Sequence, residues 1–278
     1  MWTSVSGAAA QAQSVDTVAN NLANADTLAF KKDAPAFKEY LATLEREHAP
    51  GDIPKGPVKD ADFYPLDGKD QAFVVTEGTY TNFRAGTLRV TQNPLDVALD
   101  GPGFIEVSTP AGPRFTRQGS LKLGADGRLV TAEGNPVLAE AAGGIAGAQA
   151  GVAPPAGQAA DVARFINLKD MGTHFTINSV GEIYAGNELV AKMNVVEFKD
   201  LNKLRKVGAA MFENKDATNL KIADRTQVRQ GVVETSNVNP IEEMTNLIKA
   251  NRLFEHDLKA MKTYGELLQK EATDIGKL

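Results

Sequence analysis

The stretch NPIEEMTNLIKANRLFEHDLKAMKTYGELLQKEATDIGKL, residues 239–278, decides the architecture because it reads as one uninterrupted helix. Asn239 is a typical N-cap, Pro240 suits the first helical position, and Glu242 lies in the first turn. At about 1.5 Å per residue, such a helix would be roughly 58 Å long, too long to be buried in a small domain. Its apolar and small residues recur at spacings of three and four, which indicates one packing stripe: Met244, Leu247, Asn251, Phe254, Leu258, Met261, Gly265, Leu268, Ala272 and Ile275.

The N-terminal residues repeat this pattern, with a stripe formed by Val5, Ala8, Ala12, Val15, Ala19 and Leu22. A stripe kept over several turns needs a partner, because isolated helices are marginal in water. The partner is either the other terminal helix of the same chain or the ends of neighbouring subunits. The small residues in both stripes allow close packing but bury little area each, which favours stability gained from many copies packing together.

A second short helix is expected after Asp33, because Pro35 suits a first helical turn. The apolar residues that follow lie at i, i+3, i+4 and i+7, the spacing of one helix face: Phe37, Tyr40, Leu41 and Leu44.

The middle of the chain instead has a period of two and turn residues. Asp100-Gly101, Asp126-Gly127 and Glu133-Gly134 suit tight turns, since glycine tolerates a positive φ. We therefore expect a mainly β, antiparallel central domain of short strands, flanked by the two terminal helices. The expected strands cover residues 71–76, 88–92, 104–109, 114–117, 128–131, 175–178, 194–198 and 226–233.

These patterns predict three parts. Residues 1–44 and 236–278 would form a terminal helical domain, residues 45–70 an extended proline-rich linker, and residues 71–235 the β-rich domain. Within the last, residues 141–160 hold nine alanines, five glycines and two prolines with no charge, so we expect a mobile loop there.

Composition excludes several function classes. With 30 basic and 35 acidic residues the formal net charge is −5, which argues against a nucleic-acid or anionic-membrane surface. No apolar run approaches the roughly 18 residues of a membrane span. The absence of cysteine removes disulfides, thiolate nucleophiles and cysteine-ligated metals. The first residues carry no lysine or arginine and no apolar core of a signal peptide, so we expect no cleaved leader.

The sequence predicts no catalytic, cofactor or metal site. His48, His174 and His256 have no carboxylates at metal-ligand spacing around them. Phosphate-binding, dinucleotide-binding and nucleophile-elbow motifs are missing, and the glycines at 101 and 103 lie between strands, with no following helix. A β-rich hydrolase, the enzyme alternative, lacks a set of nucleophile, base and orienting group.

Three asparagines at the end of the first helix are unusual, because asparagine is a poor helix former. Asn20, Asn21 and Asn24 indicate either a fraying terminus or an amide network reserved for a neighbouring chain. Arg252 and Glu255, three residues apart on the long helix, are ordinarily a weak surface pair.

Several runs resemble the flagellar axial family, the rod, hook and hook-associated proteins. The N-terminal signature is ANNLANADT at 19–27 with Phe30-Lys31, although Ala29 stands where the family has glycine, so a less sharply bent turn is expected. The closing motif is ETSNVNP at 234–240, with Glu243-Met244 and RLFE at 252–255. The runs LDVALDGPGF at 95–104 and FTRQGS at 115–120 resemble the β-domain of the rod and hook subgroup.

The resemblance implies that the terminal helices pair as a coiled-coil-like inner domain, with the β-domain outside it. It also implies a structural, non-enzymatic subunit without cofactors. Such a subunit is exported by the flagellar type III apparatus without a cleaved signal peptide and assembles with other rod subunits in the periplasm. It inserts into no membrane. The length of 278 residues favours a single-β-domain rod protein, and the opening residues favour the proximal-rod subunit adjoining the distal rod.

The alternatives are the distal rod subunit or, in another class, a secreted binding module on a helical stalk. The expected assembly interface comprises Val5, Ala12, Val15, Asn20, Asn21, Leu22, Asn24, Met244, Leu247, Asn251, Arg252, Phe254, Glu255, Leu258, Met261 and Leu268.

Overall fold

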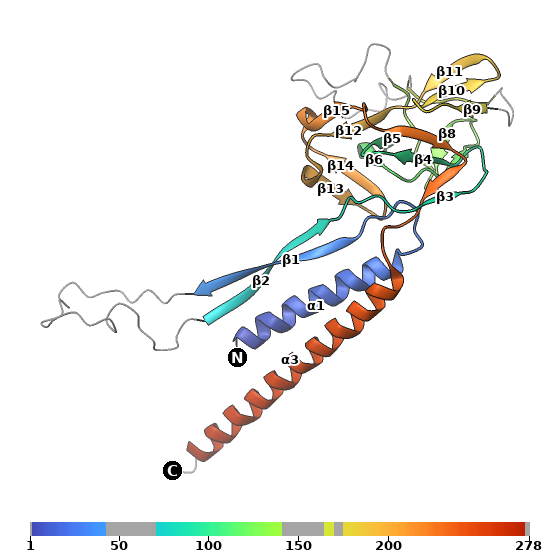
Figure 1. Ribbon diagram of the computed structural model, residues 1–278. Helices are drawn as coiled ribbons and strands as arrows, with labels where there is room; N and C mark the ends of the chain where they lie inside the picture. Colours follow the sequence, from blue (N-terminus) through green and yellow to red (C-terminus); the bar gives the residue numbers. More distant parts are fainter. Residues whose placement is uncertain (1, 43–70, 141–163, 170–174, 276–278) are drawn as a thin grey trace, which may run out of the picture. The chain divides into compact units, whose positions relative to one another are not determined.

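The computed structural model describes residues 2–42, 71–140, 164–169 and 175–275 (Figure 1). The expected linker at 45–70 and the expected loop at 141–160 lie outside the described residues, as do His48 and His174. The chain divides into two compact units, one formed by Met1–Ala19, Ala34–Tyr80 and Glu242–Leu278, the other by Asn20–Asp33 and Thr81–Ile241.

Both long terminal helices form as predicted. Helix α1 spans Trp2–Ala23 and helix α3 spans Pro240–Ile275. The backbone N–H of Ile241 donates a hydrogen bond of 3.1 Å to Oδ1 of Asn239, so Asn239 is the N-cap of α3. Neither described helix is apolar over a length sufficient to cross a lipid bilayer.

The predicted helix after Asp33 is wrong. Strand β1, Asp33–Ala42, pairs with β2, Gln71–Thr81, in a two-stranded sheet. Aromatic residues such as Phe37 favour strands, and Pro35 is compatible with a strand that has an unpaired edge. Long-range pairing with β2, which the local spacing of apolar residues does not report, selects the extended conformation.

The rest of the chain is a set of small antiparallel sheets, as predicted (Figure 1). The largest has six strands in the order β13-β14-β6-β5-β12-β15, and a second has the order β11-β10-β9. Three pairs complete the set: β16 with β4, β17 with β3, and β7 with β8. The strands are β3 Leu88–Val90, β4 Val97–Asp100, β5 Phe104–Thr109, β6 Gly112–Thr116, β7 Leu121–Leu123, β8 Leu129–Thr131, β9 Phe175–Ile177, β10 Glu182–Ala185, β11 Glu188–Lys192, β12 Val195–Phe198, β13 Leu204–Val207, β14 Met211–Asn214, β15 Leu220–Ile222, β16 Gln227–Gln230 and β17 Val232–Glu234.

Positive backbone angles confirm the predicted glycine turns. Gly101, Gly127 and Gly134 have φ values of 136°, 76° and 88°. Gly231, with φ of 73°, divides the single strand expected at 226–233 into β16 and β17. The chain therefore leaves one sheet and enters another at this glycine.

Two apolar cores hold together the second compact unit, Asn20–Asp33 with Thr81–Ile241, which we call the β-unit. Aliphatic side chains of many strands fill the larger one, including Val97, Ile105 and Ile183, which are fully buried. The smaller core is aromatic, with edge-to-face ring contacts at centroid distances of 5.0–5.6 Å. Its members are Phe104, Phe115, Val196, Phe198, Leu204 and Phe212, with Phe83 packed against them.

Two short 3-10 turns precede the edge strands of the six-stranded sheet. Turn η2, Leu201–Lys203, leads into β13, and η3, Ala217–Asn219, leads into β15. Each is capped by an aspartate, Asp200 or Asp216, which accepts a bond from a backbone N–H two residues on. The turns are linked, since Asn219 donates to the Asp200 carbonyl at 2.8 Å and Lys203 binds Asp216 at 2.9 Å.

We predict that Asp216 makes stability pH-dependent at acid pH. Hydrogen bonds from the hydroxyl of Thr218, from Lys203 and from the Thr218 N–H lower the pKa of Asp216 from 3.8 to about 2. Because the folded pKa is depressed, this stabilisation is present above about pH 4 and is lost as the pH falls through about 2. Urea unfolding should show the wild type and Asp216→Asn converging over that window, and parallel pH profiles would contradict the prediction.

We predict that Gly119→Ala is strongly destabilising. A Cβ at Gly119 would lie 1.5 Å from the carbonyl oxygen of Val97, so β4 would have to move. We expect a loss of about 3 kcal/mol in the free energy of unfolding, the upper end of the cost of overpacking. The control is Gly124→Ala, where the nearest atom would be 3.5 Å away, and urea denaturation measures both. Equal losses in the two variants would contradict the prediction.

Candidate functional site

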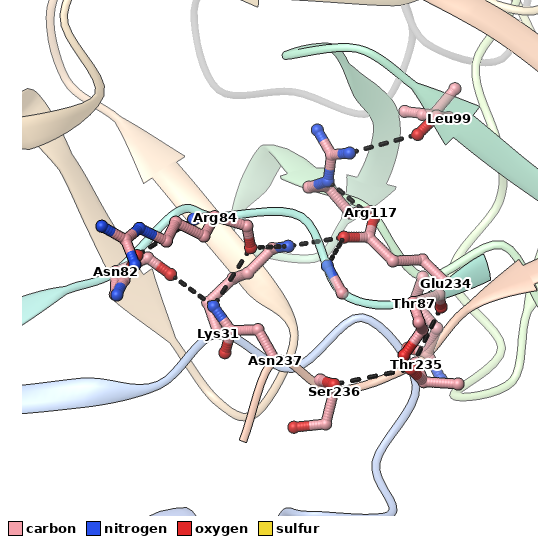
Figure 2. Close-up of polar contacts among 12 residues, drawn as sticks. Lys31, Asn82, Arg84, Thr87, Leu99, Arg117, Glu234, Thr235, Ser236 and Asn237 are labelled. Atoms are coloured by element: carbon pink, nitrogen blue, oxygen red, sulfur yellow. Dashed lines mark hydrogen bonds and ion pairs between the residues drawn. The ribbon is translucent and has the colours of Figure 1, made fainter. Parts of the chain in front are cut away.

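Three of the sequence runs quoted above meet at one buried junction in the β-unit (Figure 2). We call residues 20–33 the N-terminal arm, because they lead from the end of α1 to β1. We call residues 234–237 the closing segment, because they lead from β17 towards α3. The third partner is Arg117, which immediately follows β6.

The carboxylate of Glu234 is the centre of the junction. Its Oε1 atom accepts bonds from Nζ of Lys31 at 2.6 Å and from the backbone N–H of Gly86 at 2.8 Å. Its Oε2 atom accepts a bond from Nε of Arg117 at 2.8 Å. The side chains of Lys31 and Glu234 are fully buried and that of Arg117 is 4% exposed. One anion is thus shared by two cations that come from distant parts of the sequence.

Arg117 is held by carbonyl groups of the β4–β5 turn. Its Nη1 atom donates to the carbonyls of Gly101 and Gly103, both at 2.8 Å, and Nη2 donates to that of Leu99 at 3.2 Å. The guanidinium carbon also lies 5.5 Å from the ring centroid of Phe104. Arg117 therefore connects the run LDVALDGPGF to Glu234.

Burial and neighbouring charge oppose each other in this cluster. Burial alone would raise the pKa of Glu234, but the charges of Arg117 and Lys31, with bonds from Lys31 and Gly86, outweigh it. The pKa of Glu234 therefore lies below its usual value and the carboxylate stays ionised at neutral pH. Burial lowers the pKa of Lys31, and the nearby Arg117 charge adds to this, while Glu234 acts against it.

Asn237 ties the arm and the closing segment to the chain between β2 and β3 (Figure 2). Its Nδ2 donates to the carbonyls of Asn82 at 2.8 Å and Arg84 at 3.1 Å, while its Oδ1 accepts the Lys32 N–H at 2.8 Å. Next to it, Thr235 donates its N–H to the Thr87 carbonyl at 2.9 Å. One asparagine thus satisfies groups on two segments.

Glycine is required where this chain passes the closing segment. A Cβ at Gly86 would lie 2.0 Å from the Thr235 carbonyl oxygen, so the two backbones could not approach as they do.

The expectation of a less sharply bent turn at Ala29 is wrong. Ala29 adopts φ of 55°, the left-handed conformation that glycine would take, and its N–H donates to the Glu234 carbonyl at 2.9 Å. This hydrogen bond and full burial keep alanine in a conformation that costs about 1–2 kcal/mol. The position needs the left-handed conformation whether or not the residue is glycine.

Lys206 of β13 holds the arm from another side. Its Nζ donates to the Lys31 carbonyl and to Oδ2 of Asp33, each at 2.7 Å. The same atom lies 3.7 Å from the centroid of the Phe30 ring, a cation–π contact.

The structure gives two of the three asparagines roles within their own chain. The side chain of Asn21, 1% exposed, donates to the Asp33 carbonyl at 2.7 Å and accepts its N–H at 3.0 Å. Asn24 donates to the Asn20 carbonyl at 2.9 Å and accepts a bond from Thr27 at 3.1 Å. The side chain of Asn20 is exposed. At the end of the helix, these two amides therefore bind groups of their own chain.

The stripe expected on α3 is divided between two faces. Leu247, Phe254 and Met261 are partly buried, but Met244 and Leu258 are 48% and 43% exposed. The inner face is completed instead by Ala250, buried, and by other residues at spacings of three and four: Glu243, Asp257 and Gly265.

An outer apolar stripe remains exposed on the same helix: Ile241, Met244, Ile248 and Leu258. At 100° per residue its members lie about 60–160° around the helix axis from the inner face, and Leu253, Tyr264 and Leu267 are exposed outside it. Asn251, Arg252 and Glu255 are also exposed, whereas the side chain of Leu268 is outside the described residues.

On α1, the six members of the expected stripe differ in burial. Ala8 is buried, Val5 and Ala19 are exposed, and three are partly buried: Ala12, Val15 and Leu22. The most buried side chains of this helix are Ala8, Ala10, Thr17, Val18 and Asn21.

Sequence reasoning did not select the junction residues as a site. Lys31, Arg117 and Glu234 lie inside the quoted runs, but no two of them are neighbours in sequence. The available signal was charge beside apolar residues: Lys31 follows Phe30, and Glu234 follows two valines. In the part of the chain that the structure describes, no cluster of three or more histidines and carboxylates could hold a metal ion. The junction joins three distant segments through buried ion pairs, which is the arrangement of a structural clamp.

Three family models match the chain. A model of the flagellar basal body rod protein matches residues 1–31, one of the D1 domain of the flagellar hook protein FlgE/F/G matches residues 98–185, and one of the C-terminal part of the flagellar basal body rod FlgEFG protein matches residues 229–275. The junction unites all three matches, because Lys31, Arg117 and Glu234 each lie in a different one.

Individual relatives cover nearly the whole chain. The flagellar basal-body rod protein FlgF of Caulobacter vibrioides is 29% identical over 95% of this chain and 92% of its own length. The rod protein FlgG of Buchnera aphidicola subsp. Schizaphis graminum is 29% identical over 97% of both chains. The rod protein FlgG of Borreliella burgdorferi is 28% identical over 96% of this chain and 95% of its own.

We predict that loss of the Glu234 charge destabilises the protein more than loss of the Lys31 charge. Glu234→Gln leaves two buried cations without a counter-ion, and we expect it to cost about 3–5 kcal/mol. Lys31→Met preserves the neutral pair of Arg117 and Glu234, so its cost should be clearly smaller. Urea unfolding of the full-length chain measures both free energies. Equal losses, or a larger loss in Lys31→Met, would show that Glu234 is not the shared anion on which the junction depends.

Proposed function

We propose that this chain forms the part of the proximal rod that adjoins the distal rod. It belongs to the flagellar basal-body rod proteins of the FlgF and FlgG type, and it is a structural rod subunit rather than an enzyme. The observation that carries the proposal is the full-length similarity to rod proteins together with the junction that unites their three matched regions. In this role the chain assembles with other axial proteins into a shaft that transmits torque.

Assembly uses the terminal helices as the shared inner part of the shaft. Residues 1–44 and 236–278 serve as the assembly domain, with the β-rich part, residues 71–235, outside it. The approach of α1 and α3 supports this pairing, since a Cβ at Gly7 would lie 3.6 Å from Oδ2 of Asp257. The helices would pair as a coiled coil along the inner face of α3.

The outer stripe of α3 is the surface that a neighbouring subunit would cover. Four apolar side chains are exposed on it over 18 residues, Ile241, Met244, Ile248 and Leu258, and a lone chain gains nothing from such a stripe in water. A helix with a mixed inner face and exposed apolar side chains on another side could pack on its own chain and on a second copy at once, as a helical, head-to-tail assembly requires. Of the expected interface residues, Met244 and Leu258 belong to this surface.

Export through the flagellar type III apparatus and assembly in the periplasm complete the proposal. The absence of cysteine in the 278 residues supports it, since a chain that crosses an export channel unfolded then forms no disulfides.

The distal rod is the second candidate position, because relatives named FlgG are as similar as those named FlgF. Complementation separates the two. Expression of this chain should restore swimming in a strain that lacks only its proximal-rod counterpart. Restoration only in a strain that lacks the distal rod subunit would overturn the assignment. The alternative of a non-flagellar binding module is set aside, since the relatives that cover 95–97% of this chain are named as rod proteins.

We predict that Leu258→Asp abolishes rod assembly. A carboxylate in the outer stripe would have to be desolvated against the neighbouring subunit, which costs more than the lost contact. Swimming in soft agar should fall to the level of the deletion strain, while the purified monomer keeps its unfolding midpoint. The matched control is Thr263→Asp, which adds the same charge at an exposed position of α3 off the stripe and should swim normally. Normal swimming of Leu258→Asp would refute the assignment of the stripe.

A further inference from the structure

We infer that the closing segment gates the N-terminal arm: the arm takes its fixed place on the β-unit only after residues 234–237 have paired with it. The inference goes beyond the proposed function, because it concerns the order in which the chain folds. It depends on the contacts of the junction and on their charges.

Four consecutive residues of the arm bind the closing segment. The N–H of Ala29 donates to the Glu234 carbonyl at 2.9 Å, and the Phe30 carbonyl accepts the Asn237 N–H at 3.3 Å. Nζ of Lys31 binds the Glu234 carboxylate, and the Lys32 N–H donates to Oδ1 of Asn237. The arm is therefore joined to the closing segment by two backbone bonds and two side-chain bonds.

Charge makes the order of events one-directional. Lys31 is fully buried, and the other ionic group of its cluster besides Glu234 is Arg117, also a cation. If the arm docked before the closing segment, Lys31 would be buried beside Arg117 without a counter-ion, which is strongly unfavourable. Glu234 can be in place first without this penalty, because Arg117 already balances it at 2.8 Å. Docking of the arm is therefore unfavourable before Glu234 is in place, whereas Glu234 can take its place before the arm docks.

The other contacts of the arm do not replace the gate. Residues 81–84 are held by Phe83 in the aromatic core as well as by Asn237, but their bonds to the arm, such as that from the Asn82 N–H to the Lys32 carbonyl at 2.8 Å, supply no negative charge to Lys31. Lys206 is an independent tether, but it is a third cation and cannot neutralise Lys31.

The closing segment lies near the C-terminal end of the sequence, so the arm depends on residues that come late in the chain. Lys31 and Glu234 are 203 residues apart, and α3 begins at Pro240. When the N-terminus of the chain appears first, the arm therefore cannot take its place on the β-unit until the residues just before α3 are also present. Only a nearly complete chain then presents the end of α1 in its final place.

Pulse-labelled hydrogen exchange during refolding of the full-length chain from urea tests the order directly. We expect the amides of Ala29, Lys32 and Asp33 to gain protection in a later phase than those of β5 and β6. Protection of these arm amides in the same phase as β5 and β6, or earlier, would overturn the inference. This comparison needs no variant.

Equilibrium exchange on Asn237→Ala gives the second readout. The substitution removes the bonds to Lys32, Asn82 and Arg84, so exchange of the arm amides should accelerate at least tenfold while β5 and β6 keep their rates. The control is Thr218→Ala, which removes a hydroxyl from the η3 turn and should leave the arm unchanged. Unchanged arm exchange in Asn237→Ala would contradict the gate. If the variant loses protection throughout, the refolding order of the wild type decides.

Discussion

One buried carboxylate that balances two buried cations joins the N-terminal arm, the closing segment and the end of β6. Transferring an ion into the protein interior costs several kcal/mol, and the cost is offset only where opposite charge and hydrogen bonds are placed with good geometry. Glu234 meets this condition with Lys31, Arg117 and the Gly86 N–H, all at 2.6–2.8 Å. We expect the charge cluster to favour a single register of the arm, because a slip would leave a buried ion unpaired.

This constraint places the ends of both helices on one unit. The arm holds the chain just after α1, and the closing segment holds it just before α3. The C-terminal end of α1 and the N-terminal end of α3 therefore both connect to segments of the β-unit. For a rod subunit the consequence is mechanical. The arm and the closing segment are held within the β-unit by short hydrogen bonds and ion pairs, which stretch little. In the proposed assembly, the outer stripe of α3 would face the next subunit.

Prediction from sequence succeeded where the signal is local. The N-cap of α3, the long helices, the glycine turns and several strands follow from residue type and spacing. It failed where partners are distant. The spacing of Phe37 and its neighbours suits a helix, but pairing with β2 makes a strand. Ala29 takes a left-handed turn because the Glu234 carbonyl binds its N–H, which no local rule reports.

The junction was not predicted because its partners are distant in the sequence, although each of them lies in one of the quoted runs. Lys31, Arg117 and Glu234 are separated by many residues, and a single charge beside apolar residues is ordinarily taken as a surface residue. The stripe on α3 was found, but its division into two faces depends on which residues its own chain covers. Spacing identifies a stripe, whereas only the fold assigns it to a partner.

A double-mutant cycle between Arg117 and Glu234 measures how strongly the shared carboxylate stabilises the junction. The free energies of unfolding of the wild type, Arg117→Met, Glu234→Gln and the double variant give the coupling between the two side chains. If Glu234 is the anion on which the junction depends, the coupling is about 2–3 kcal/mol, near the upper end for residues in one network. A coupling below about 0.5 kcal/mol, the value expected of independent sites, would contradict the account.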